Sequence, residues 1–392
     1  MTVSSGNRLR QSKRKRNADK AATKLFLDGQ LDWCQPCYAD APILPIDEDA
    51  VEVIHKASMR VLRDCGILFL NDGALKVLGE HGCLVDWSSK TVRMDPAWVM
   101  EQVAKAPSQI TVTPRNRQRM LTFGGRYFNF GQVASPPNVM DLDNGRRIGT
   151  RLDMQNFLKL AQAYNCIHFS CGYAVEPMDI HPSVRHLDSL FDMLTLTDKV
   201  VHAYSLGTER IEDAMEMVRI AAGLSYEQFE EKPRMFTNIN STSPLKHDWP
   251  MLDGAMRMAA RNQMVVISPF TLAGAMAPVT LAGALTLQNA EALAAIALLQ
   301  AVRRGAPVIY GAFTSNVDMK TGAPAFGTPE FVRAMQISGQ LARYYDLPLR
   351  ASNANAANAL DAQAVWESAF SLQGSCSGGA NLIYHAAGWM EG

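Results

Sequence analysis

Three segments decide the fold: MVVIS at residues 264–268, TLAGALTLQNAEALAAIALLQAVR at residues 280–303 and PVIYG at residues 307–311. The first and the third are short, continuously apolar runs, which are typical of strands buried on both faces. The long middle segment has the length of a helix. Apolar strands separated by helices indicate a parallel sheet that is covered on both sides.

The same alternation extends from residue 151 to the end of the chain. We expect seven strands, at residues 167–171, 200–204, 235–239, 264–268, 307–311, 348–352 and 381–385. Six helices are expected between them, near residues 183–197, 209–223, 249–262, 280–303, 328–344 and 361–374. Six strand-helix units and a seventh strand are more than most open sheets need, so we expect an α/β fold that closes as a (β/α)8 barrel, the TIM barrel.

The seventh strand lies almost at the end of the chain, and a barrel broken there would expose a strand edge. Either an earlier segment supplies the eighth strand, or the C-terminal end is missing from the chain. We expect the second, so the barrel at residues 151–392 is predicted to be incomplete at its C-terminus.

Residues 25–150 are predicted to form an N-terminal α+β region that packs on the barrel. Its expected elements are helices at 47–65, 73–80 and 95–104, a hairpin at 83–94, and short strands at 110–113 and 126–130. Residues 1–24 combine many Lys and Arg with few apolar positions, which is typical of a disordered arm. A contact of this basic arm with nucleic acid or phosphate is the alternative.

The bulk composition excludes several classes of protein. Lys plus Arg and Asp plus Glu both total 38, so the net charge indicates neither a nucleic-acid nor a membrane partner. No apolar run reaches the roughly 20 residues of a membrane span, since the longest, at 290–299, contains Glu291. The N-terminus has no apolar signal core, and the seven scattered cysteines fit a reducing compartment. We therefore expect a cytoplasmic protein.

Active sites of such barrels lie at the carboxyl ends of the strands, and these ends are here rich in Asn, Ser, Thr and aromatic residues. Few Lys, Arg or paired carboxylates accompany them, which argues against sugar phosphates and against a Schiff-base enzyme. A neutral, aromatic-lined pocket suits a small cation or zwitterion, because aromatic faces attract quaternary ammonium groups. The aromatic candidates are Phe270, Tyr310, Phe313 and Tyr384, although strand alternation prevents all of them from facing inward.

Each candidate also has a structural interpretation. Aromatic residues at strand ends often fill the core, Asn-rich loops often form turns, and His385 could be a structural hydrogen-bonding group. No His, Cys and carboxylate set has metal-ligand spacing, so we expect no metal. Cys34-x-x-Cys37 lacks the second pair that a zinc site needs.

Several ordered motifs resemble the trimethylamine methyltransferase superfamily, over roughly residues 40–392. They are Ala57-x-x-x-Val61-Leu62-x-x-x-Gly66-Ile67, Ser241-Thr-Ser243-Pro244-Leu245, residues 273–283 (AGAMAPVTLAG), Gln288-Asn289-Ala290-Glu291, Tyr310-Gly311, Gly327-Thr-Pro329-Glu330, Gly378-Gly379-Ala-Asn381 and His385-Ala-Ala-Gly388-Trp-Met-Glu391-Gly392. The resemblance implies a (β/α)8 barrel that docks a corrinoid-binding protein, whose cobalt(I) attacks the methyl carbon of a methylated amine. It implies no tightly bound cofactor. A homo-oligomer is an open alternative.

The founding members of this superfamily carry pyrrolysine in the loop after the sixth barrel strand. The corresponding loop here, Arg350-Ala-Ser-Asn353-Ala-Asn355, contains no special residue. Pyrrolysine is thought to activate neutral amines, whose displacement would expel a poor leaving group. A quaternary ammonium leaves as a neutral tertiary amine, so the resemblance implies a substrate such as glycine betaine.

The roles implied for individual residues follow from this substrate. The aromatic side chains of Phe270, Tyr310 and Phe313 are expected around the ammonium. A carboxylate or polar tail is expected at four amides, Asn238, Asn240, Asn353 and Asn355. Gln288, Glu291 and His385 are expected to support the pocket, although Glu291 could cap its own helix. The alternatives are a barrel that binds betaine without turnover, a methyltransferase for another N-methyl donor such as trimethylamine, and an unrelated barrel lyase.

Overall fold

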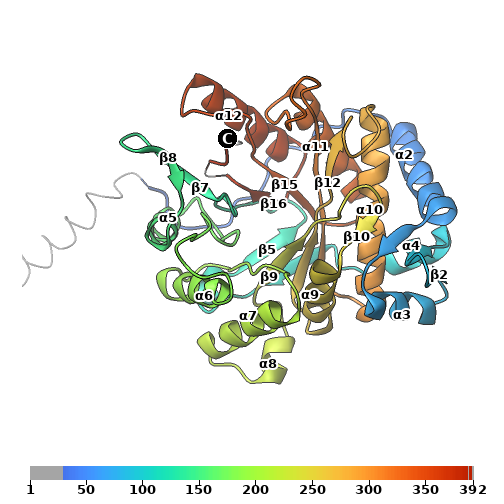
Figure 1. Ribbon diagram of the computed structural model, residues 1–392, viewed down its shortest axis with the longest axis horizontal. Helices are drawn as coiled ribbons and strands as arrows, with labels where there is room; N and C mark the ends of the chain where they lie inside the picture. The colour runs from blue at the N-terminus through green and yellow to red at the C-terminus, as the bar shows by residue number, and fades with distance from the viewer. Residues whose placement is uncertain (1–29, 387, 391–392) are drawn as a thin grey trace, which may run out of the picture.

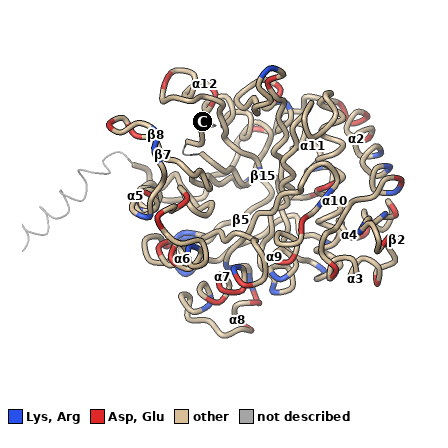
Figure 2. Tube along the Cα trace, viewed as in Figure 1, with Lys and Arg blue, Asp and Glu red and all other residues tan. Residues whose placement is uncertain are grey.

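Figure 1 shows the computed structural model of the chain, which describes residues 30–386 and 388–390. Helices surround a central twisted sheet. Lys, Arg, Asp and Glu residues lie mainly on the outer helices and loops, as the coloured trace in Figure 2 shows. The basic arm predicted for residues 1–24 lies outside the described residues.

The N-terminal helices and hairpin are confirmed. The helix predicted at 47–65 begins where the Asp47 carboxylate accepts a hydrogen bond from the Ala50 amide at 2.8 Å, and it ends in a π-helical turn before Gly66, whose φ is 80°. The strands predicted at 83–94 pair antiparallel. The elements are α2 (Glu48–Arg60), η1 (Val61–Cys65), β1 (Ile67–Phe69), α3 (Asp72–Glu80), β2 (Leu84–Asp86), β3 (Thr91–Arg93) and α4 (Pro96–Val103). With β10 (Lys246–His247) the strands form a sheet in the order β10-β1-β3-β2.

A second hairpin packs against the amino ends of the central strands. It consists of β4 (Gln109–Val112) and β5 (Leu121–Gly124), joined through η2 (Arg117–Arg119). The Thr113 amide donates to the Pro233 carbonyl, just before a central strand, and the Phe123 ring lies 6.2 Å from the Phe169 ring. The hairpin therefore closes the N-terminal side of the sheet.

The central sheet is parallel, which confirms the α/β class and the buried parallel sheet. Its order is β6-β16-β15-β13-β11-β9. The strands are β6 (Asn129–Phe130), β9 (Phe236–Ile239), β11 (Met264–Ile267), β13 (Val308–Gly311), β15 (Leu349–Ser352) and β16 (Leu382–Tyr384). The helices in this part of the chain are α5 (Arg151–Ala163), α6 (Arg185–Leu196), α7 (Thr208–Ala221), α8 (Tyr226–Glu230), α9 (Trp249–Ala260), α10 (Leu281–Val302), α11 (Pro329–Tyr344) and α12 (Ala362–Ser377).

Two predicted strands are reduced to isolated parallel bridges. The segment predicted at 167–171 contributes Phe169, and the segment at 200–204 contributes Val200 and His202. These bridges run from Gly131 to Phe169, from Phe169 to Val200 and from His202 to Phe236. They join the two edges of the six-stranded sheet, because Gly131 follows β6 and Phe236 begins β9.

The expectation of an open edge beside the last strand is wrong. β6 pairs in parallel with β16, with Leu382 opposite Asn129 and Ile383 opposite Phe130. An earlier segment therefore supplies the neighbouring strand, which is the alternative set aside in favour of a missing C-terminal end. β6 belongs to the stretch predicted as a separate N-terminal region, and sequence distance hid its pairing partner.

Alternate residues of each strand sort into two apolar clusters. Val265, Ile267 and Val308 lie with the helices in the larger cluster. Met264, Val266 and Ile309 lie with the β4–β5 hairpin in the smaller cluster, inside the curve of the sheet. A two-residue period with apolar side chains on both faces is the expected signature of a buried parallel strand.

α10 is the most deeply buried helix of the outer layer, packed between the sheet and helices α2 and α4. Its 22 residues are long and apolar enough to cross a membrane, contrary to the expectation that no run reaches that length, but 78% of the apolar window is buried inside the protein. Burial on all sides explains its almost uniformly apolar sequence.

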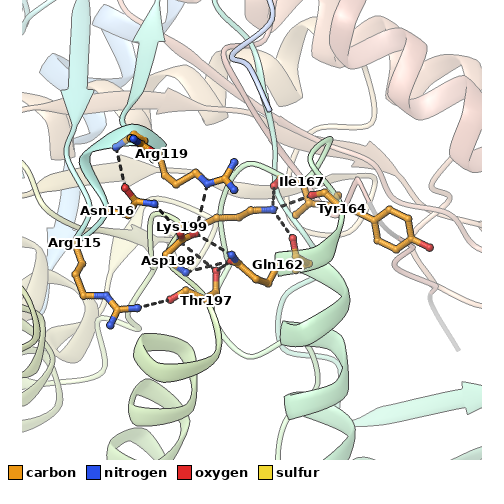
Figure 3. Close-up of polar contacts among 11 residues, drawn as sticks. Arg115, Asn116, Arg119, Gln162, Tyr164, Ile167, Thr197, Asp198 and Lys199 are labelled. Atoms are coloured by element: carbon orange, nitrogen blue, oxygen red, sulfur yellow. Dashed lines mark hydrogen bonds and ion pairs between the residues drawn. The ribbon is translucent and has the colours of Figure 1, made fainter. Parts of the chain in front are cut away.

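A buried lysine fixes α5 to the strand region, as Figure 3 shows. The Lys199 ammonium donates to the carbonyls of Ala161, Tyr164 (2.8 Å) and Ile167 (2.6 Å) at the C-terminal end of α5. Asp198 accepts hydrogen bonds from Asn116 and Gln162 beside it. These contacts lie before the segment that begins at Val200, on the side of the amino ends of the strands. In this architecture that side stabilises the fold, and active sites lie on the opposite side.

Candidate active site

The inward face of the sheet changes from apolar to polar along the strands. Phe236, Val266 and Leu382 belong to the inner apolar cluster, and Asn238, Ser268 and Tyr384 follow two residues later on the same face. We call the polar set the polar layer; it comprises His202, Asn238, Ser268, Arg350, Ser352, Tyr384 and His385. It lies at the carboxyl ends of the strands, where active sites of parallel α/β folds are found.

Contacts within the polar layer connect its members. The His202 and Tyr384 rings lie 6.2 Å apart, and the His385 ring lies 5.6 Å from Tyr384. The His202 Nε2 atom accepts a hydrogen bond from the Asn238 amide at 3.1 Å. Gly311 lies opposite Arg350 and leaves space for Ser268, since a Cβ atom at Gly311 would come within 2.6 Å of it.

Many polar atoms of this layer have no hydrogen-bond partner in the described part of the chain. They are His202 Nδ1, Asn238 Oδ1, Ser268 Oγ, Arg350 Nε, Ser352 Oγ, Tyr384 Oη and His385 Nδ1, to which Asn353 Oδ1 and Asn355 Oδ1 of the adjacent loop are added. Native interiors leave few buried polar atoms unpaired, and a cluster of them needs an explanation. Such a cluster at the carboxyl end of a parallel sheet indicates a ligand site.

The titratable groups of the site are neutral at pH 7, with one exception. Burial lowers the pKa of His202 to about 3 and that of His385 well below its ordinary value, and the nearby Arg350 charge lowers both further. Burial also raises the pKa values of Tyr384 and Cys171 well above their usual range. The exception is Arg350: burial lowers its pKa to about 10, which leaves it protonated. The site therefore has no thiolate and no anionic base.

Aromatic rings form the rim above the polar layer. β12 (Phe270–Ala273) and β14 (Phe313–Asn316) pair in parallel and place the Phe270 and Phe313 rings 5.1 Å apart. The Trp389 ring lies 5.6 Å from the His385 ring and 6.4 Å from Phe313. Phe270 and Trp389 are only partly buried, so their faces remain available to a ligand.

A cleft of about 900 Å³ borders this rim. One wall is formed by Leu360, which precedes α12, and by Ala364 and Ser368 of α12. The hairpin of β7 (Asn138–Asp141) and β8 (Gly145–Ile148) forms the other wall. Asn353, Asn355 and Trp389 lie where the cleft meets the site. The surface of the cleft is mainly apolar.

The structure brings most predicted site residues together. Phe270, Phe313 and His385 share the rim and the layer below it, and Asn353 and Asn355 line the cleft. The Asn238 side-chain amide donates to the Asn240 side-chain oxygen at 2.7 Å, so these two lie together at the end of β9.

Tyr310, Gln288 and Glu291 lie elsewhere, on the helix side of the sheet. The Tyr310 hydroxyl donates to Asn289 Oδ1 at 3.0 Å and accepts from Gln288 Nε2 at 3.3 Å. The structure thus excludes Tyr310 from the predicted aromatic pocket, because strand alternation turns its ring toward α10 rather than inward.

Glu291 holds the loop after β9 from outside the sheet. Its carboxylate accepts hydrogen bonds from the Ser241 hydroxyl, from the Ser243 hydroxyl at 2.7 Å and from the Leu245 amide at 2.7 Å. Burial raises the pKa of this carboxyl group. Glu291 therefore supports the loop after β9 rather than the pocket itself.

Sequence reasoning missed Arg350, His202 and Trp389. Arg350 lies within a predicted strand, at a position whose alternation points inward, but it was assigned to the loop that follows. The signal that could have found it is a charged residue between apolar strand positions, which is costly unless it serves a ligand.

Among the residues that the structure describes, no group of His, Cys, Asp and Glu could hold a metal ion. Cys34 and Cys37, the two cysteines of the CxxC motif, are both exposed free thiols.

Comparisons with known proteins agree with the motifs. The family described as trimethylamine methyltransferase (MTTB) matches residues 7–392. The chain is 37% identical over 347 residues to the glycine betaine methyltransferase of Desulfitobacterium hafniense (strain Y51), covering 88% of this chain and 72% of that protein. It is 30% identical over 351 residues to the trimethylamine methyltransferase MttB of Desulfitobacterium hafniense (strain DSM 10664 / DCB-2), covering 88% and 69%. It is 27% identical over 354 residues to the proline betaine:corrinoid methyltransferase of Eubacterium limosum, covering 87% and 71%.

Solved structures agree on the fold. The monomethylamine methyltransferase MtmB of Methanosarcina barkeri superposes with a TM-score of 0.60 at 10% identity, over 89% of this chain and 71% of that one. The hydroxylamine complex of MtmB gives the same TM-score over 90% and 72%. Together with the sequence matches, these findings show that the chain is a methyltransferase and belongs to the trimethylamine methyltransferase family.

Proposed function

We propose that this enzyme transfers a methyl group from a quaternary amine, such as glycine betaine, to the cobalt(I) of a corrinoid held by a separate protein. The observation that carries the proposal is that the titratable groups described in the site supply no anionic nucleophile. Burial keeps Cys171 a thiol and Tyr384 a phenol at neutral pH, and it makes His202 and His385 weak bases, so these four groups supply no anionic nucleophile. The nucleophile is then the cobalt(I) of the corrinoid, which the partner protein brings to the site. The names of the relatives, glycine betaine methyltransferase and proline betaine:corrinoid methyltransferase, support both the betaine and the corrinoid as substrates.

The reaction is a displacement at carbon. Cobalt(I) supplies the electron pair for the new bond to the methyl carbon, the C–N bond breaks, and its electron pair stays on nitrogen as a neutral tertiary amine. No proton moves, so the reaction needs neither a general acid nor a general base from the site. The residues of the chain bind and orient the amine and exclude water.

The rim supplies the ammonium contacts in this proposal. The rings of Phe270 and Trp389 offer partly exposed faces, and cation–π attraction to such faces holds quaternary ammonium groups. Asn353 and Asn355 line the cleft, and the side-chain oxygen of each has no partner among the described residues and can accept a hydrogen bond from a ligand or from the corrinoid partner. The apolar cleft beside the rim gives that partner a route to the methyl group.

The fold proposal is a closed (β/α)8 barrel. Its support is the set of parallel bridges at Phe169, Val200 and His202, which link the edges of the six-stranded sheet through two further segments. In the same proposal residues 30–150 pack on the barrel, apart from β6, which is one of the strands of the barrel. A cytoplasmic location is proposed with it, since the reaction needs a strongly reduced cobalt.

The experiment mixes the purified protein with cob(I)alamin and, separately, glycine betaine, proline betaine, choline and trimethylamine. Loss of the Co(I) absorption and growth of the methyl-Co(III) absorption report the reaction. We expect conversion with a quaternary amine and none with trimethylamine. Phe270→Leu should slow conversion about tenfold, and Tyr226→Leu, at an exposed aromatic on α8, should not.

Conversion with trimethylamine alone would instead support a methyltransferase for tertiary amines. If no donor is converted by folded protein, also after addition of a corrinoid protein, the transferase proposal fails. Tight betaine binding in that case would support the second candidate, a non-catalytic betaine-binding barrel, which the same neutral site could serve.

A further inference from the structure

Arg350 is a buried cation with no anion beside it among the residues that the structure describes. Its side chain is 3% exposed, and its only hydrogen bond within residues 30–386 and 388–390 runs from Nη1 to the Ala312 carbonyl at 3.2 Å. The Nε atom has no partner in that part of the chain, and no carboxylate there lies within 4.0 Å of the guanidinium. A buried charge is costly unless it is paired, and such groups are kept where a ligand pairs with them.

The surroundings hold the guanidinium in place and leave its charge uncompensated. It lies 4.5 Å from the centre of the Tyr384 ring and 5.0 Å from the centre of the Phe313 ring. His202 and His385 beside it are neutral. Two aromatic faces thus fix the plane of the guanidinium, and a fixed, planar fork of donors matches a carboxylate.

The charge also dictates the direction of a bound zwitterion. The polar layer holds one positive charge, so it attracts a single carboxylate and repels an ammonium group. Asn353 and Asn355 follow Arg350 along the chain and line the cleft together with Trp389, and Phe270 lies beside Phe313 at the rim. A carboxylate at Arg350 therefore turns the ammonium and its methyl groups toward the cleft.

We propose that Arg350 binds the carboxylate of a betaine and thereby selects zwitterionic over purely cationic quaternary amines. This inference rests on the proposed function and adds the carboxylate site. The sequence predicted that four asparagines bind the carboxylate, and the inference assigns that role to Arg350 instead. Asn238, Asn240, Asn353 and Asn355 then shape the walls around the ligand.

The test is calorimetric binding of glycine betaine and of choline, which lacks the carboxylate, to the full chain without corrinoid. Arg350→Gln should weaken glycine betaine binding about 100-fold, because a charged and buried hydrogen-bond partner is lost. Choline binding should strengthen, because a repelling charge is removed. Arg350→Lys should restore part of the betaine affinity.

Arg234→Gln is the matched control. Arg234 is also buried and also has an unpaired Nε atom, but it lies before β9 at the opposite end of the sheet, where Nη2 donates to the Gln228 carbonyl at 3.2 Å. It should bind both ligands like the wild type. Thermal unfolding of each variant verifies that it is folded.

Unchanged betaine affinity in folded Arg350→Gln overturns the inference, and so does a wild-type protein that binds choline as tightly as glycine betaine. An equal loss in Arg234→Gln does the same, since the effect would then be global. The binding assay contains no cobalt, so a failed methyl-transfer assay with Arg350-dependent betaine binding refutes the reaction and leaves the carboxylate site standing.

Discussion

Replacing Arg350 with methionine should leave the unliganded protein as stable as the wild type or slightly more stable. The fall of its pKa to about 10 corresponds to roughly 3 kcal/mol against the charged form. Methionine removes that cost. It also removes the hydrogen bond to the Ala312 carbonyl, worth about 1 kcal/mol, and two ring contacts of about 0.5–1 kcal/mol each.

These terms leave a net change between about zero and a gain of about 1 kcal/mol. Truncation of a large buried side chain normally costs about 2–5 kcal/mol, so the sign alone distinguishes the two cases. For a chain of 392 residues, 1 kcal/mol shifts Tm by about 1 °C. We expect the Tm of Arg350→Met to lie at or up to about 1 °C above that of the wild type.

Differential scanning calorimetry at one scan rate, with and without saturating glycine betaine, measures both states. Betaine should raise the Tm of the wild type and leave that of Arg350→Met nearly unchanged, because ligand stabilisation scales with affinity. A drop of more than about 3 °C in the unliganded variant would refute the reasoning. It would mean that the guanidinium is a structural group whose partners stabilise the fold.

Three further predictions test the structure around the site. Tyr310→Phe should lower Tm by about 1–2 °C, because the hydroxyl loses its hydrogen bonds to Gln288 and Asn289. Its affinity for glycine betaine should stay within twofold of the wild type. A tenfold loss of affinity would show that Tyr310 lines the pocket. His202 has a pKa of about 3 when folded and an ordinary value when unfolded, so its contribution to stability is complete above about pH 6.5 and is lost as the pH falls toward 3. At pH 5 that loss is about 2 kcal/mol. The decrease in Tm between pH 7 and pH 5 should therefore be about 2 °C smaller in His202→Asn than in the wild type. Equal decreases would show that folding does not lower the pKa of His202. Lys199→Met should lower Tm by about 4 °C, measured at pH 7, because three carbonyls at the end of α5 lose their donor; an unchanged Tm would contradict the contacts of Figure 3.

The candidate site was predicted in its location and only partly in its members. Phe270, Phe313 and His385 were found because they follow apolar strands, and strand ends converge in a parallel sheet. Tyr310 was misplaced because facing depends on the exact register of a strand, and a shift of one residue reverses it. Arg350 was missed for the same reason, since its inward direction follows from its pairing opposite Gly311.

The sequence by itself determined the layered α/β architecture, the helices α6, α7, α9, α10, α11 and α12, and the family, whereas α5 and α8 were not predicted. These depend on local periodicity and on ordered motifs, which need no knowledge of distant contacts. Only the tertiary structure decided that β6 lies beside β16, that two expected strands are reduced to isolated bridges, and that the Arg350 guanidinium lies within an otherwise neutral polar layer. Pairing across more than 250 residues and the direction of each side chain depend on which distant strands pair in the folded sheet, and no local pattern encodes that pairing.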